Sequence, residues 1–243
     1  MRDEIKIKIP KQILKEKCSG KKILVLYWLY YNQNKGQKIN CFIPKMMYDL
    51  GLDCKGAQST KNSKELISIL QEFVDNNMLI KQNNDITYSH DRYGTFCFVK
   101  KNNKNILDLL DSQFVICTEK EIGTLVKAKK NNILRAHFNT VVALYFYLKA
   151  CANTSSSTII SFPTIENMCH ALDVSKECIQ NTLKDLQYIG LIYKYNVNNY
   201  YSSTGVLKQN KTIYAFTKYD SNEVKKEFYN QTNGFEWRDL NEK

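Results

Sequence analysis

Apolar and polar positions follow the same order of patterns in two parts of the chain. In the first part, a broad apolar and aromatic stripe predicts a helix over 22–34, and a second helix runs from Ser63-Lys64-Glu65 to an apolar step at Met78-Leu79-Ile80. The second part repeats both patterns, with an apolar helix around Leu144-Tyr145-Phe146 and a later helix that starts at Ser175-Lys176-Glu177. A repeat this long is typical of two copies of one small domain, not of a solenoid.

Between these two helices, each copy has a predicted short helix that starts at a proline. Pro44 and Pro163 suit a helix start because their missing N–H is a group that the helix leaves unpaired there in any case. A brief strand at 41–43 is expected before the first of these short helices. Gly51 then ends that helix at a turn, and Asp173 takes the equivalent position in the second copy, since aspartate also tolerates turn conformations.

The second copy has the clearer pattern. Apolar residues at helical spacing share one face of its short helix: Ile165, Met168, Cys169 and Leu172. Ser175 is a suitable N-cap for the helix that follows. Alternating aromatic residues then predict two strands, over 193–200 and 211–219, joined by a polar loop at 202–210. The predicted order of elements is typical of a winged-helix DNA-binding domain. Such a domain has a helix, a short helix, a turn, another helix and a hairpin, and the hairpin is called the wing.

Two further patterns flank the first copy. Alternating apolar residues over 5–9 predict an edge strand that Pro10 stops. Between the copies, a strand at 114–117 and a capping box at 118–121 predict a helix over 119–130, with lysines near its C-terminal end, where the helix dipole favours cations. We interpret this helix as a leading helix packed on the second copy, and a basic bridge lying on DNA is the alternative.

The chain is therefore expected to have an α+β fold with two winged-helix modules, each a three-helix bundle with a β-hairpin wing. The predicted organisation is an N-terminal extension over 1–20, winged-helix module 1 over 21–103, a connecting strand and helix over 104–136, winged-helix module 2 over 137–218 and an acidic C-terminal segment over 219–243. That last segment either docks a protein partner or packs back on the body as a helix, and the sequence favours neither.

Charge and cysteine content narrow the class of protein. The 243 residues carry a formal net charge of +11, and 1–103 alone holds 18 basic and 10 acidic side chains, which suits a polyanionic partner. Most of the basic residues are lysines, a bias that an AT-rich genome also produces. Eight cysteines, none in a C-x-x-C pair, and three histidines favour free thiols in a reducing cytosol over zinc or disulfides.

Catalytic and membrane functions find no support in the sequence. It has no complete phosphate-binding loop, no His-x-His pair and no arguable Ser-His-Asp set. No apolar run approaches the roughly 20 residues that span a bilayer. We expect a cytoplasmic protein that is not an enzyme and that has no cofactor and no metal.

The segment from Pro163 to Ile192 resembles the helix-turn-helix of bacterial winged-helix proteins, including plasmid and phage replication initiators of Gram-positive bacteria and DnaD-type primosomal proteins. The resemblance rests on Leu172-Asp173-Val174-Ser175 at the turn and on Ile189-Gly190-Leu191-Ile192 at the step into the wing. Those families have Leu-Gly-Val-Ser and Leu-Gly-Leu-Ile type sequences there. The first copy matches loosely, because 53–62 is inserted after its turn. The resemblance implies DNA binding in a replication setting.

A recognition helix reads base edges from its N-terminal half and its exposed face. Gln180 and Asn181 stand out because an amide can form two hydrogen bonds with adenine, so we expect an A/T-leaning site. The residues expected to bind DNA are Ser175, Lys176, Gln180, Asn181, Lys184, Lys208 and Lys211 in module 2, and Lys61, Ser63, Lys64, Ser68, Gln71, Lys81 and Arg92 in module 1. The alternative is a solvated polar helix face that touches no DNA.

We therefore hypothesise sequence-specific binding of double-stranded DNA, in replication initiation or control of a plasmid, phage or integrative element. A winged-helix transcriptional regulator is one alternative, and its dimer would read a palindrome. A protein–protein interaction module of a replication or primosome complex, with little specific DNA affinity, is another. Double-stranded DNA is the expected partner, replication proteins and a second copy of the chain are further candidates, and no membrane is expected.

Overall fold

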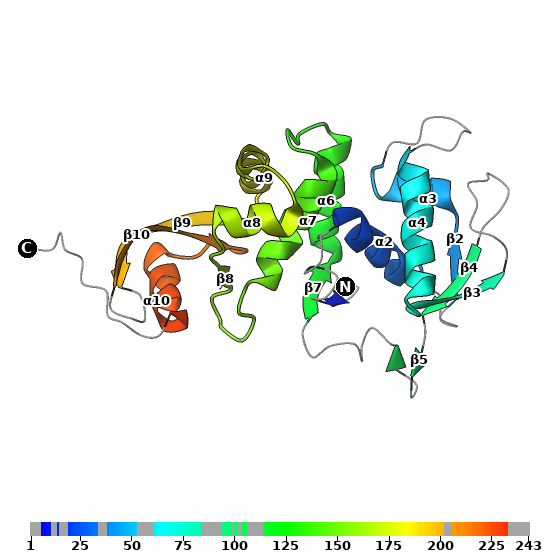
Figure 1. The fold of residues 1–243 in the computed structure, drawn as a ribbon, viewed down its shortest axis with the longest axis horizontal. Helices are drawn as coiled ribbons and strands as arrows, with labels where there is room; N and C mark the ends of the chain where they lie inside the picture. Colours follow the sequence, from blue (N-terminus) through cyan, green and yellow to red (C-terminus); the bar gives the residue numbers. More distant parts are fainter. Residues whose placement is uncertain are drawn as a thin grey trace, which may run out of the picture. The chain divides into compact units, whose positions relative to one another are not determined.

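The computed structural model describes residues 6–10, 14, 19–33, 38–52, 61–83, 94–98, 100–101, 104–105, 114–201 and 206–232. Within these residues the fold is α+β, as predicted, with helices interspersed among small antiparallel sheets (Figure 1). The chain divides into two compact units, Met1–Ala143 and Leu144–Lys243. Among the described residues, none of the helices combines the length and apolarity that crossing a membrane requires.

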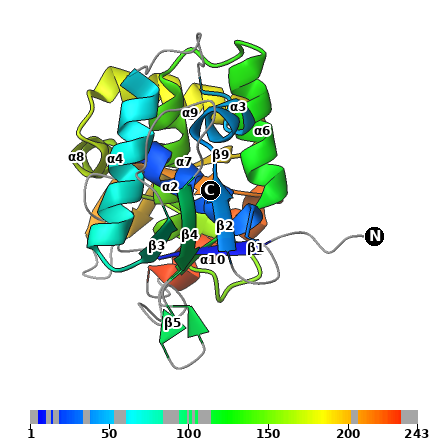
Figure 2. The ribbon, with the colours of Figure 1, turned by 90° about the vertical axis from the view of Figure 1, so that its right-hand side faces the viewer.

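Within the described residues, the first unit contains a three-stranded antiparallel sheet and two separate strand pairs. Its elements in chain order are β1 (Lys6–Pro10), α2 (Gly20–Tyr31), β2 (Lys38–Cys41), α3 (Ile43–Asp49), α4 (Lys61–Asp75), β3 (Leu79–Asn83), β4 (Gly94–Phe98), β5 (Lys100–Lys101), β6 (Lys104–Asn105), β7 (Phe114–Thr118) and α6 (Glu119–Lys130). The sheet order is β2-β4-β3, so the strand before α3 pairs with the last strand of the hairpin (Figure 2). The predicted N-terminal strand is confirmed as β1, which pairs with β7.

The core of the first unit is built around α2. Its apolar stripe is broad because the helix is buried on most sides, with every residue from Ile23 to Leu29 buried. The Trp28 indole N–H donates to Asp49 Oδ2 at 2.8 Å, which ties α2 to α3. Pro44 lies in the first turn of α3, as predicted. The strand before this helix lies at Lys38–Cys41, not at 41–43, because α3 already begins at Ile43.

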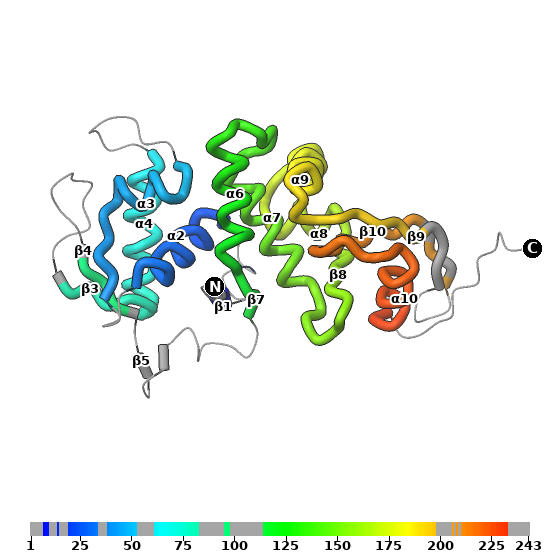
Figure 3. Tube along the Cα trace, turned by 180° about the vertical axis from the view of Figure 1, so that it is seen from behind, coloured from blue at the N-terminus to red at the C-terminus, as the bar shows by residue number. Residues whose placement is uncertain are grey.

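The helix over 119–130 is confirmed as α6, together with its capping box. Thr118 Oγ1 accepts a hydrogen bond from the Glu121 N–H at 3.3 Å, and Glu121 Oε2 accepts one from the Thr118 N–H at 2.9 Å. We expected this helix to belong with the second copy, but it packs within the first unit (Figure 3). Lys130 Nζ lies 4.5 Å from the ring centroid of Tyr48 on α3, which anchors the end of α6 there.

The division between the units falls inside α7 (Phe138–Ala150), and the residues of this helix up to Ala143 belong to the first unit. There they supply a cap for α2. Ser19, the N-cap residue of α2, makes no side-chain hydrogen bond to the helix. Asn139 Oδ1 accepts one from the Lys21 N–H instead, at 2.8 Å. Gly20 permits this contact, because a Cβ at that position would lie 2.2 Å from the Asn139 carbonyl oxygen.

The second unit repeats the sheet order of the first. After α7 come β8 (Ile160–Ser161), α8 (Ile165–Leu172), α9 (Lys176–Tyr188), β9 (Tyr193–Tyr201), β10 (Leu207–Ala215) and α10 (Ser221–Gln231). Its antiparallel sheet has the order β8-β10-β9. The predicted boundaries of the hairpin need correction. Strand β10 begins at Leu207, opposite Tyr201, so the predicted loop over 202–210 is shorter and both Lys208 and Lys211 lie on the strand.

Helix α10 forms part of the core of the second unit. Its Val224 and Phe228 are fully buried, in a cluster with Ile160, Val197 and Ile213 of the sheet. Of the two alternatives for the C-terminal segment, packing on the body therefore holds for Ser221–Gln231. The rest of that segment, 233–243, lies outside the described residues.

Candidate nucleic-acid interface

The turn before α9 has the geometry that the sequence predicts. Asp173 ends α8 in the left-handed conformation, with φ 54° and ψ 49°, the region that glycine usually occupies at such a turn. Ser175 then caps α9, since its Oγ accepts a hydrogen bond from the Cys178 N–H at 3.2 Å. The inner face of α9 buries three apolar side chains, Ile179, Leu183 and Leu186, together with the polar Thr182 and Asp185.

The opposite face of α9 is polar and accessible. Lys176, Gln180 and Lys184 are exposed at a spacing of four residues, so they form one stripe along the helix, and Asn181 is half-buried beside it. Sequence reasoning missed Tyr188, whose side chain is 80% exposed at the C-terminal end of the same face. The spacing from Lys184 to Tyr188, again four residues, was the signal for it.

Three lysines gather where the start of α9 meets the hairpin. Lys176 of α9 and Lys211 of β10 both act electrostatically on Glu166, in the first turn of α8. Hydrogen bonds with its own backbone N–H and the Thr164 side chain hold the pKa of Glu166 below its usual value, and the two lysines lower it further. Lys208 in turn acts on Lys211. Lys176, Lys208 and Lys211 therefore share one electrostatic field, and we call them the lysine cluster.

Lys211 is the half-buried member of the cluster. Burial is the main cause that lowers the pKa of its ammonium group, and the charge of Lys208 lowers it further, while Glu166 opposes both. The Nζ atom lies 5.7 Å from the ring centroid of Phe162. Its protonated form is thus less stable than that of a lysine in water. A phosphate oxygen placed beside it would stabilise the charge.

The first unit brings together Lys64, Ser68, Gln71 and Lys81 along one groove of about 670 Å³ beside α4. Two carboxylates, Glu72 and Asp75, line the same groove. Glu72 Oε1 pairs with Lys22 Nζ at 2.5 Å, and Asp75 Oδ1 accepts a hydrogen bond from Gln71 Nε2 at 2.7 Å. The lysines of this groove therefore face acidic groups, which makes it a weaker site for phosphate than the lysine cluster.

Two predicted residues of the first unit lie outside this groove, and a third falls outside the described residues. Lys61 is exposed at the start of α4. Ser63 requires a correction, because its side chain is 0% exposed and so cannot reach DNA from the helix surface. It shares the spacing of the buried Leu66 and Leu70, which is the pattern that places it in the core. Arg92 lies outside the described residues.

Comparisons with known proteins identify no relative. The chain matches no protein-family model and no curated protein sequence. In the part of the chain that the structure describes, no group of three or more His, Cys, Asp or Glu side chains is placed to hold a metal ion. Any functional assignment therefore rests on the sequence, the topology and the surface of this chain.

Proposed function

We propose that the chain binds double-stranded DNA in a sequence-specific manner, through α9 and the β9–β10 hairpin. One observation carries the proposal: Lys176 at the start of α9 and Lys211 of the hairpin both act on Glu166, and Lys176 shares the exposed face of α9 with Gln180. Lysines fix a protein on the phosphate backbone, whereas amides read base edges. The second unit thus combines both kinds of contact on neighbouring elements.

The order of elements supports a winged-helix assignment for both units. Each has an apolar helix, a short strand, a short helix, a longer helix and a hairpin, and in each the short strand pairs with the last strand. Under this assignment, α9 and α4 are the recognition helices, and β9–β10 and β3–β4 are the wings. The positions of Lys208 and Lys211 on β10 make them wing residues that contact phosphate or the minor groove.

The two units are proposed to contribute unequally to DNA binding. The second unit is the principal reader, because Glu166 is the carboxylate that acts on its lysine cluster, while the groove of the first unit holds two carboxylates. Lys61 and Lys64 of the first unit add phosphate contacts. Two linked DNA-binding units gain effective concentration, since the second contact becomes intramolecular.

The proposed setting is the initiation or control of replication of a plasmid, phage or integrative element. It follows from the resemblance of 163–192 to replication initiators and DnaD-type proteins, and not from the geometry. Direct repeats in the bound DNA would support this setting, whereas a palindrome would favour a transcriptional regulator.

Selection from a random-sequence duplex library, at two salt concentrations, tests the proposal. Gln180→Ala with Asn181→Ala should relax specificity, by about 1–3 kcal/mol per lost base contact. Lys208→Ala with Lys211→Ala should weaken binding to all sequences and reduce the salt slope by about 0.9 per lost phosphate contact. Lys218→Ala with Lys226→Ala, at two exposed lysines outside the lysine cluster, controls for loss of the same two charges.

Each outcome has a definite meaning. A sharp motif that survives the higher salt, and that the amide variant blurs, would support specific DNA reading by α9. Enrichment that is diffuse and disappears at the higher salt would exclude it. If Lys218→Ala with Lys226→Ala weakens binding as much as Lys208→Ala with Lys211→Ala does, net charge and not the lysine cluster carries the affinity.

A further inference from the structure

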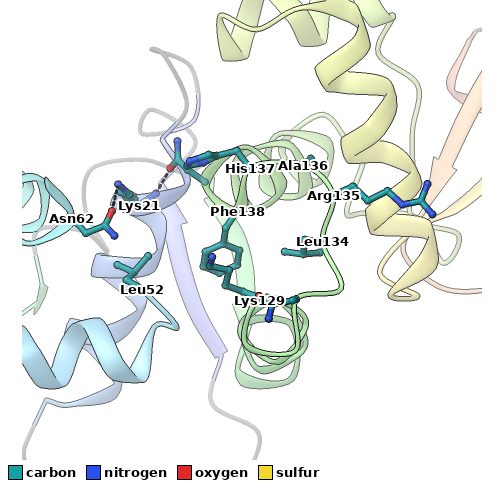
Figure 4. A pocket seen from close by; sticks show the side chains of 11 residues that line it. Lys21, Leu52, Asn62, Lys129, Leu134, Arg135, Ala136, His137 and Phe138 are labelled. Carbon is teal, nitrogen blue, oxygen red and sulfur yellow. Dashed lines mark hydrogen bonds between the residues drawn. The ribbon is translucent and has the colours of Figure 1, made fainter. Parts of the chain in front are cut away.

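A pocket of about 380 Å³ opens on the first unit, and none of its lining residues belongs to the proposed DNA-reading surface of the second (Figure 4). Segments far apart in the sequence form it: the starts of α2, α4 and α7 and the C-terminal end of α6. The lining residues that matter for its chemistry are Lys21, Asn62, Lys129, His137, Phe138 and Asn139. Its volume lies within the range of small-molecule sites, roughly 300–1,000 Å³.

The polar groups in this pocket are mainly hydrogen-bond donors. Asn62 Oδ1 accepts a hydrogen bond from Lys21 Nζ at 3.0 Å, and Asn139 Oδ1 accepts one from the Lys21 N–H at 2.8 Å. Both amide oxygens are therefore occupied, which leaves the NH₂ groups of these two side chains for a ligand. Figure 4 shows Lys21 and Asn62 joined in this way at one side of the pocket.

The charges around the pocket favour an anion. Lys21 Nζ also pairs with Glu65 Oε2, so its charge is balanced within the fold. Lys129, at the end of α6, adds a cation, and His137 adds a side chain that becomes cationic when protonated. Of the described residues that line the pocket, none is Asp or Glu.

The walls of the pocket are partly apolar. Leu52 and Phe138 line it and are buried, at 8% and 6% exposed. Apolar walls exclude water, and a charge–charge attraction is stronger where water is excluded. The backbone N–H groups in the first turn of α7 add to the preference for negative charge. The pocket thus combines donors, a cation and an apolar wall, which together suit an organic phosphate.

We propose that this pocket binds a phosphate group, carried either by a free nucleotide or by the backbone of a nucleic acid. Lys129 forms the charge-assisted hydrogen bonds to the phosphate oxygens, and the NH₂ groups of Asn62 and Asn139 complete the contacts. This site shares no lining residue with the DNA-reading surface of the second unit, and it includes neither Lys61 nor Lys64 of the first unit.

Lys129→Met tests the site, and Lys127→Met is its matched control. Methionine keeps the length and the apolar stem of lysine but removes the charge. Lys127 is exposed on the same helix and does not line the pocket. Calorimetric titration of the full chain with inorganic phosphate, with ATP and with a random-sequence duplex measures binding by both variants. We expect Lys129→Met to lose about tenfold or more in affinity, and Lys127→Met to lose little.

The three probes separate the sources of the phosphate. Binding of phosphate or ATP that depends on Lys129 would support a free-ligand site. A dependence on Lys129 that only the duplex shows would support a backbone-phosphate contact. Binding of none of the probes, or equal losses in the two variants, would overturn the proposal. Chemical-shift changes of the His137 ring in the unmodified protein, on addition of ATP or of the duplex, provide a readout that needs no variant.

Discussion

Replacing Gly20 with alanine should destabilise the first unit, although alanine is the better helix former. A Cβ at position 20 would lie 2.2 Å from the Asn139 carbonyl oxygen, 2.8 Å from Val142 Cβ and 3.0 Å from the Ala143 nitrogen. Two of these three atoms belong to the backbone of α7, so no side-chain rotation relieves the clash. Ordinary contacts of a Cβ begin at 3.4 Å, and α2 and α7 must therefore separate by about 1 Å.

The magnitude follows from three contributions. Overpacking of this kind costs about 1–3 kcal/mol. Separation of the helices also weakens the hydrogen bond from the Lys21 N–H to Asn139 Oδ1, which contributes about 1 kcal/mol. Against these losses, alanine restricts the unfolded chain and so stabilises by about 0.4–1 kcal/mol. We expect the free energy of unfolding of the first unit to fall by about 2 kcal/mol.

Gly123→Ala provides the matched control. Gly123 lies inside α6, and a Cβ there would meet nothing within 4 Å. Alanine should therefore stabilise the helix, by about 0.5–1 kcal/mol. Urea titration followed by circular dichroism measures both variants. A Gly20→Ala protein as stable as the unmodified chain would refute the close approach of α2 and α7.

Three further predictions concern the second unit. Lys211→Met should keep or slightly raise the free energy of unfolding, because burial already lowers the pKa of Lys211. The same variant should reduce the salt slope of DNA binding by about 0.9. Matched losses of stability and affinity would count against this prediction. Asp173→Ala should lower the free energy of unfolding by about 1 kcal/mol, because alanine adopts the left-handed conformation of this residue less readily than aspartate does. A denaturant melt measures the change, and an unchanged midpoint would contradict the turn geometry. Burial raises the pKa of Tyr214 from 10.0 to about 12, so its contribution to stability is present below pH 10 and is lost as pH rises through 12. Tyr214→Phe should remove this loss between about pH 10 and about pH 12. A variant with the same pH dependence as the unmodified chain would show that another group titrates.

An element could be predicted from the sequence where the residues that define it are close neighbours along the chain. The capping box of α6 needs only Thr118 and Glu121, and the structure confirms both hydrogen bonds and the bounds of the helix. The N-cap of α9 needs only Ser175, and it is confirmed in the same way. Such signals survive folding because the groups that they pair are at most three residues apart.

Features that depend on distant contacts could not be predicted. The assignment of α6 to the second copy was wrong, because the partner of Lys130 is Tyr48, far away in the sequence. The start of β10 was placed too late, since a strand continues as long as its partner pairs with it, here to Leu207 opposite Tyr201. The capping of α2 by Asn139 leaves no trace in the sequence around Gly20, apart from the glycine itself.

The candidate site has both features that could be predicted from the sequence and features that could not. It also indicates which lysines stabilise the fold. Positions along α9 follow from helical spacing, but the action of both Lys176 and Lys211 on Glu166 depends on the tertiary fold that brings α9 and β10 near the start of α8. In the first unit, Lys21 and Lys22 are paired with carboxylates, so their charges help to hold helices together. In the second unit, Lys176 and Lys211 both act on Glu166, and Lys208 acts on the half-buried Lys211. Burial disfavours the charged form of Lys211, so this charge does not stabilise the folded chain, and a phosphate backbone would offset that cost.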